Sequence, residues 1–86
     1  MIDTRSYTEI YDSLDSFQRS ELISALMKDM TCADSTLRNY RLGNRAPKPI
    51  YQRQMAKTIK RVLGIEVSLA HLFPDSQYAK RLRADR

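Results

Sequence analysis

Eighty-six residues are enough for one domain with a single modest core, and too few for two. The composition, 42% hydrophobic and 29% charged with one cysteine and one histidine, is typical of a globular protein and leaves no internal disulfide or metal cluster. The net charge of +5 indicates a basic protein, and because neither a signal peptide nor a membrane-spanning run is evident, we expect it in the cytoplasm.

The first two helices are predicted from apolar residues at helical spacing. A helix over residues 5–14 is indicated by Tyr7, Ile10, Tyr11 and Leu14. Asp15 and Ser16 interrupt this pattern and can cap a second helix over residues 17–30. Its apolar face comprises Leu22, Ile23, Leu26, Met27 and Met30. Residues 1–16 are therefore predicted to be an N-terminal helix with the segment that leads into it.

A third helix is predicted over residues 31–42, ended by Gly43. Thr31 and Asp34 have the spacing of a capping box, in which side-chain oxygens accept hydrogen bonds from free amides of the first turn. The inward side is expected to hold Ala33, Thr36, Leu37 and Tyr40. The outward side is expected to hold Asp34, Ser35, Arg38, Asn39, Arg41 and Leu42.

Two further helices complete the prediction. Pro49 suits the first turn of a fourth helix that ends at Gly64. Its inner side is predicted to be Ile50, Tyr51, Met55, Ile59, Val62 and Leu63, and its outer side Gln52, Arg53, Lys57, Lys60 and Arg61. A short fifth helix over residues 69–73 can be capped by Ser68. Residues 74–86 are predicted to be a basic tail, although 77–83 can be helical. The fold class is an all-α compact bundle of about five helices in one domain, residues 1–86.

Charge is distributed unevenly along the chain. Residues 1–34 carry a net charge of −4, whereas residues 35–86 carry +9. Between residues 35 and 61 there are eight basic residues and no acidic one. Surfaces usually mix both signs, so a stretch of one sign this long favours a polyanionic partner, with a basic face kept for solubility as the alternative.

The predicted third helix has chemistry suited to double-stranded DNA. Two helices joined by a tight turn, the second of them basic, form the helix-turn-helix arrangement. Arginine pairs with guanine, asparagine with adenine, and serine with either, so the candidate base-reading residues are Asp34, Ser35, Arg38 and Asn39. The candidate contacts to the DNA backbone are Arg41, Asn44, Arg45 and Lys48.

The same stretch resembles the Cro/repressor (XRE-like) helix-turn-helix family over about residues 23–73. The resemblance rests on Ser35-Thr36-Leu37, Gly43-Asn44-Arg45-Ala46-Pro47, Met55-Ala56, Val62-Leu63-Gly64-Ile65 and Leu69 to Leu72-Phe73. It implies base reading from Asp34, Ser35, Arg38 and Asn39, backbone contacts from Asn44 and Arg45, and Leu37 as the anchor of the recognition helix. In the family a glycine usually occupies the turn, where this chain has Thr31, and an alanine stands at the position of Met27. An acid at Asp34 suits a base donor such as cytosine N4.

The predicted function is therefore sequence-specific DNA binding by a transcriptional regulator. We also predict a homodimer, in which the acidic N-terminal half, with Tyr7 and Tyr11, forms the contact between the copies. The alternatives are a protein-interaction or adaptor module on the same scaffold, and a non-specific nucleic-acid binder. No nucleophile with a base partner and no glycine-rich phosphate loop is present in the sequence, so we expect no enzyme. No cofactor or small-molecule ligand is expected either.

Overall fold

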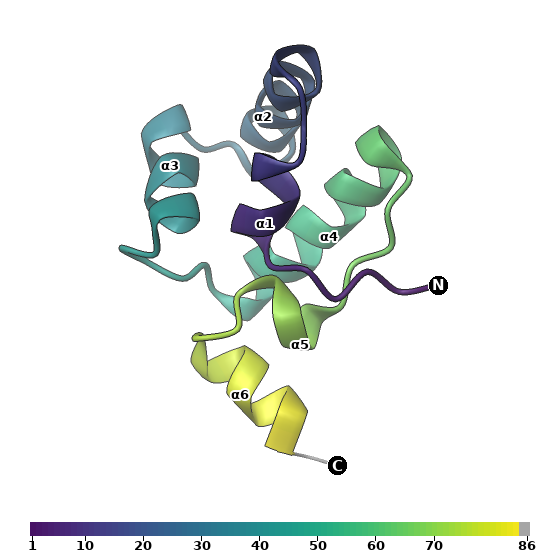
Figure 1. The fold of residues 1–86 in the computed structure, drawn as a ribbon. Helices are drawn as coiled ribbons and strands as arrows, with labels where there is room; N and C mark the ends of the chain where they lie inside the picture. Colours follow the sequence, from purple (N-terminus) through teal and green to yellow (C-terminus); the bar gives the residue numbers. More distant parts are fainter. Residues whose placement is uncertain (85–86) are drawn as a thin grey trace.

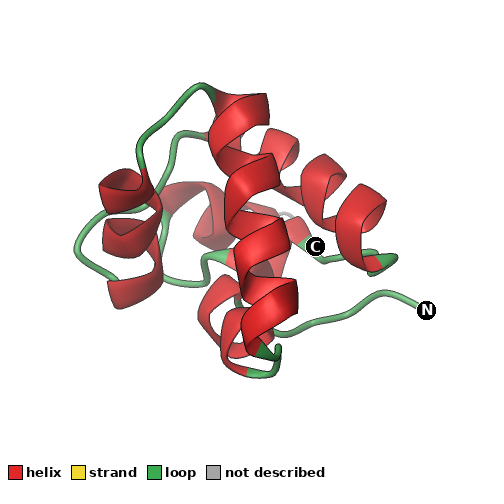
Figure 2. Cartoon of the chain, turned by 90° about the horizontal axis from the view of Figure 1, so that it is seen from above, coloured by secondary structure: helices red, strands yellow, loops and turns green. Residues whose placement is uncertain are grey.

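The computed structural model describes residues 1–84, which form six helices linked by loops, with no strand in that range (Figures 1 and 2). The helices are α1 (Tyr7–Asp12), α2 (Ser16–Met30), α3 (Asp34–Leu42), α4 (Pro49–Leu63), α5 (Leu69–Leu72) and α6 (Gln77–Ala84). The predicted all-α fold is thus confirmed, and α6 adds one helix to the five expected.

Side-chain caps begin the first two helices. Ser6 and Glu9 form a reciprocal capping box at the start of α1, so this helix begins two residues later than predicted. Asp15 and Gln18 form a second capping box at the start of α2, which confirms the capping role predicted for Asp15. Arg19 donates hydrogen bonds to the carbonyls of Tyr11 and Asp12, and thereby fixes the tight turn between the two helices.

The centre of the molecule is the packing of α2 along α4. Leu22 and Leu26 of α2 and Met55 and Ile59 of α4 are all fully buried. Polar contacts also join the two helices. Asp29 of α2 accepts a hydrogen bond from the Thr58 hydroxyl at 2.7 Å and forms an ion pair with Arg61 at 2.8 Å. These contacts lower the pKa of the Asp29 carboxyl, first through the Thr58 hydrogen bond and then through Arg61.

The turn between α2 and α3 differs from its prediction. Thr31 does not begin α3 but ends α2, in a left-handed conformation with φ 50° and ψ 52°. The capping box of Thr31 and Asp34 is therefore wrong: α3 begins at Asp34, behind Ala33, which supplies no side-chain cap. Ala33 is also exposed rather than inward. A residue in the left-handed region cannot be the extended cap of the next helix.

The first turn of α4 is rotated relative to the prediction. Ile50 and Tyr51, predicted to face inward, are 62% and 42% exposed. Gln52, predicted to face outward, is fully buried and donates a hydrogen bond to the Pro47 carbonyl at 2.8 Å. The buried face of α4 thus begins with a glutamine, because the loop before the helix covers that position and supplies a polar partner.

The C-terminal part is an ordered helix rather than a free tail over its described residues. Ala79 of α6 is buried, and Arg83 donates hydrogen bonds to the carbonyls of Ala70 and Pro74, so α6 is fastened to α5 and the link between them. Residues 85–86 of the predicted tail lie outside the described range. Ser68 precedes α5 as predicted, but its hydroxyl pairs with the His71 ring nitrogen at 2.8 Å instead of capping a backbone amide.

The N-terminal lead-in is held by main-chain hydrogen bonds. Asp3 pairs in parallel with Val67, through its amide to the Glu66 carbonyl and its carbonyl to the Ser68 amide. Figure 1 shows this segment running beside the connection from α4 to α5, away from α3.

Candidate nucleic-acid interface

The inner side of α3 is anchored to the core. Leu37 and Tyr40 are 1% and 7% exposed, which confirms the anchoring position predicted for Leu37. The Tyr40 ring meets Phe73 edge-on with ring centroids 6.1 Å apart. Thr8 of α1 donates a hydrogen bond of 2.6 Å to the Arg41 carbonyl in the last turn of α3, where helix carbonyls have no partner within the helix. Contacts from both sides thus hold α3 at its C-terminal half.

The outer side of α3 carries three of the predicted base-reading residues in exposed positions. Asp34, Ser35 and Arg38 are exposed, whereas Asn39 is half-buried. Asp34 and Arg38 lie one turn apart and form an ion pair of 3.2 Å. Both side chains remain more than half exposed, so the pair is weak and can open in favour of another partner.

The loop from α3 to α4 presents polar and basic side chains on a fixed backbone. Gly43 takes a left-handed conformation at the end of α3, with φ 80°, and the next amide, that of Asn44, bonds back to the Asn39 carbonyl at 3.0 Å. The Asn44 side-chain amide also donates a hydrogen bond to Oδ1 of Asn39 at 3.3 Å. Pro47 is buried and accepts the hydrogen bond from Gln52. The exposed Arg45 and Lys48 therefore project from a loop that is tied at both ends.

Arg41, the remaining predicted backbone contact, is held against α1. Its guanidinium sits over the Tyr11 ring, 4.5 Å from the centroid, and the Arg19 guanidinium is 4.9 Å from the same centroid. Arg41 is accordingly half-buried and turned toward α1, whereas Arg38 is exposed in its pair with Asp34. The Arg41 guanidinium is therefore already engaged within the protein.

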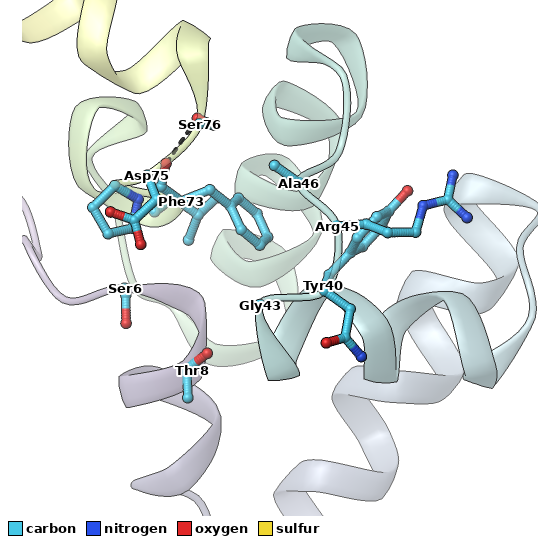
Figure 3. A pocket seen from close by; sticks show the side chains of 12 residues that line it. Ser6, Thr8, Tyr40, Gly43, Arg45, Ala46, Phe73, Asp75 and Ser76 are labelled. Carbon is cyan, nitrogen blue, oxygen red and sulfur yellow. Dashed lines mark hydrogen bonds between the residues drawn. The ribbon is translucent and has the colours of Figure 1, made fainter.

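A hollow of about 400 Å³ lies between the start of α1, the loop after α3 and the link from α5 to α6 (Figure 3). Phe73 forms part of its wall, and Ser6, Thr8 and Asp75 lie at its polar edge. The Arg45 side chain extends away from Phe73 and Asp75 in Figure 3, so the cation of the loop points outward and not into this hollow.

Two supporting residues escaped the sequence prediction. Thr8 closes the end of α3, and Gln52 fixes the loop that carries Arg45 and Lys48. Nothing in the sequence around Thr8 signals a contact 33 residues away. Gln52 gave no signal either, because a polar residue at this position fits the outer side of an amphipathic helix.

Other kinds of site find no support within residues 1–84. No three side chains among histidine, cysteine, aspartate and glutamate come together there as metal ligands. None of the helices in this range has the length and apolar character needed to cross a membrane. Comparison with family models, with curated proteins and with solved structures found no match for this chain.

Proposed function

We propose that this chain binds double-stranded DNA in a sequence-specific manner, as a transcriptional regulator of the cytoplasm and not as an enzyme. In this proposal α2, the turn at residues 31–33 and α3 act as a helix-turn-helix, with α3 in the major groove. The observation that carries the proposal is that α3 is anchored by Leu37 on one side and displays Ser35 and Arg38 on the other, beside a tied basic loop. This combination supplies both groups for base edges and groups for phosphates.

The charge of the surrounding chain supports a polyanionic partner. Arg38, Arg45 and Lys48 are exposed within residues 35–61, the stretch with eight basic residues and no acidic one. Four acidic residues are exposed earlier in the chain, in α1, at the residue that caps α2 and in α2 itself: Glu9, Asp12, Asp15 and Glu21. Phosphates attract the basic stretch and are repelled by the acidic one, so we expect a polyanion to bind at α3 and the loop after it.

A module with a single reading helix makes few base contacts, so we propose two copies on paired half-sites about one helical turn apart. Tyr7 cannot contribute to the contact between copies, because it is 1% exposed and packs against Phe73. Tyr11 is half-buried beneath Arg19 and Arg41, so it offers little area. The remaining exposed surface of this region includes the apolar Phe17, which is 72% exposed, beside acidic residues that would repel their counterparts in a second copy. Sedimentation with and without a duplex of two half-sites measures the number of copies.

The test is fluorescence anisotropy with a randomised duplex pool across a salt series, with recovery of the bound sequences. Wild type and the Arg38→Ala/Asn39→Ala variant are compared, with Lys80→Ala as a control that removes one exposed charge from α6. We expect wild type and the control to enrich one motif, and the double variant to lose enrichment while it keeps weak, salt-sensitive binding.

Two results would contradict the proposal. Binding without any enriched motif, at an affinity that falls steeply with salt, would assign a non-specific nucleic-acid binder. Absence of binding even at low salt would leave the adaptor function, with the basic face toward an acidic protein. Circular dichroism of each variant verifies that the helices are intact.

A further inference from the structure

One apolar residue stands on the otherwise polar outer side of α3. Leu42, the last residue of the helix, is 59% exposed. Residues three and four apart share a helix face, so Ser35, then Arg38 and Asn39, then Leu42 form a single stripe. Leu42 is therefore the continuation of the proposed base-reading surface by one turn.

Leu42 has no structural task in the described part of the chain. It belongs neither to the buried core nor to the partly buried apolar residues packed against it, in contrast to Leu37 on the opposite side of the same helix. A leucine exposed in this way loses the free energy that burial would supply. Single exposed apolar residues are common on protein surfaces, so the case for a partner rests on the position of Leu42 within the stripe of α3.

The charges around Leu42 indicate what that occupant is. Arg38 precedes Leu42 by one turn, and Arg45 follows it in the loop; both are exposed, and no acidic residue occurs in residues 35–61. A partner that fits this surface is an anion that also carries a small apolar group. In the major groove of DNA, the 5-methyl group of thymine is the apolar group among the base edges.

We propose that Leu42 contacts the methyl group of a thymine and so adds a specificity-determining residue to α3. This inference rests on the proposed DNA-binding function. One helical turn advances about 5.4 Å, and base pairs stack about 3.4 Å apart, so the thymine lies within about two base pairs of the positions read by Arg38 and Asn39. Leu42 thereby extends the recognised sequence at one end.

The experiment uses the intact protein and the motif recovered from the randomised pool. Each thymine of the motif is replaced in turn by deoxyuridine, which lacks the methyl group and keeps the same hydrogen-bonding edge, and binding is measured by anisotropy at fixed salt. For wild type we expect one replacement per half-site to weaken binding about fourfold, since burying one methyl group contributes about 0.8 kcal/mol. For Leu42→Ala we expect equal affinity for the thymine and uracil duplexes at that position.

Ile50→Ala is the matched control, because Ile50 is also exposed and aliphatic but lies in α4. It should keep the fourfold difference. The inference is overturned if Leu42→Ala keeps the difference as well, or if wild type discriminates at no thymine of the motif; either result leaves DNA binding itself intact. Absence of any recovered motif, by contrast, overturns the proposed function together with this inference.

Discussion

The pair of helices α2 and α4 and the single helix α3 are built in different ways. Between α2 and α4, fully buried aliphatic side chains are reinforced by the hydrogen bond and ion pair of Asp29 with Thr58 and Arg61. By contrast, α3 is short, lacks a side-chain cap at its start, and buries only Leu37 and Tyr40. We therefore expect the pairing of α2 with α4 to contribute more to the stability of the domain than α3 does.

The largest expected effect follows from emptying the core at each of these places. Leu26→Ala in α2 should destabilise the domain by about 3–5 kcal/mol, because Leu26 is fully buried and leaves a cavity between packed helices. Leu37→Ala should cost about 2–3 kcal/mol, since the short α3 can shift and fill part of the space. Urea unfolding measures both, with Leu42→Ala as the exposed control, expected within about 0.5 kcal/mol of wild type. Equal costs at Leu26 and Leu37 would refute the difference between the two regions.

A smaller effect is expected from the polar connection of α2 with α4. Thr58→Val removes the hydroxyl that donates to the Asp29 carboxylate, and we expect a loss of about 1.5 kcal/mol, as for hydrogen bonds to charged groups. Arg61→Ala removes a partner that is itself largely exposed and should cost less than about 0.5 kcal/mol. Thermal unfolding of the two variants tests the order, and a larger loss for Arg61→Ala would show that the ion pair is the main contact.

The turn at Thr31 should respond in the opposite direction. A β-branched residue in the left-handed region is strained, and glycine has no such penalty, so Thr31→Gly should stabilise the domain by about 1 kcal/mol. Ser24→Gly, an exposed position inside α2, is the control and should destabilise by roughly 0.5–1 kcal/mol. If Thr31→Gly destabilises the domain as much as Ser24→Gly does, Thr31 does not have a left-handed conformation.

The smallest effect is on the acid side of the pH profile. The pKa of Asp29 is lowered in the folded protein, so the unfolded chain binds a proton at higher pH than the folded chain does. The stabilisation is present above about pH 4, where an unfolded aspartate is ionised, and is lost as the pH falls through the lower folded value. Asp29→Asn should therefore lose less stability than wild type between pH 5 and about pH 2. Urea unfolding over that range measures it, with the exposed Glu21→Gln expected to follow wild type.

Much of this architecture could be predicted from the sequence, and the failures have physical causes. The apolar periodicity of α2 predicted its buried face, and Gly43 and Gly64 marked the ends of α3 and α4. The prediction failed at Thr31, because a threonine rarely takes the left-handed conformation and its hydroxyl suggested a cap instead. Such local choices are decided by tertiary contacts that a periodic pattern does not contain.

The candidate site divides in the same way. Asp34, Ser35 and Arg38 are exposed on α3, as its helical spacing predicted, and Asn44, Arg45 and Lys48 are exposed in the loop after it. Arg41 is half-buried, because the Tyr11 ring of a different helix binds its guanidinium. The helical spacing predicted that Leu42 faces outward. The structure shows that it is 59% exposed and does not belong to the core. Long-range contacts thus decide which members of an amphipathic pattern are free to bind a partner.

The most direct test of the account is to locate α3 on bound DNA. A DNA-cleaving chelate is attached to a cysteine at Ala33 or at Ser16 in a Cys32→Ala background, and each protein is bound to a duplex that carries the recovered motif. Ala33 is exposed, directly precedes α3 and is not a predicted DNA contact, whereas Ser16 begins α2 beside the acidic residues of the N-terminal region. With α3 in the major groove, we expect strand cleavage within the motif from the reagent at Ala33 and none from the reagent at Ser16. Cleavage within the motif from Ser16, with none from Ala33, would contradict this placement of α3.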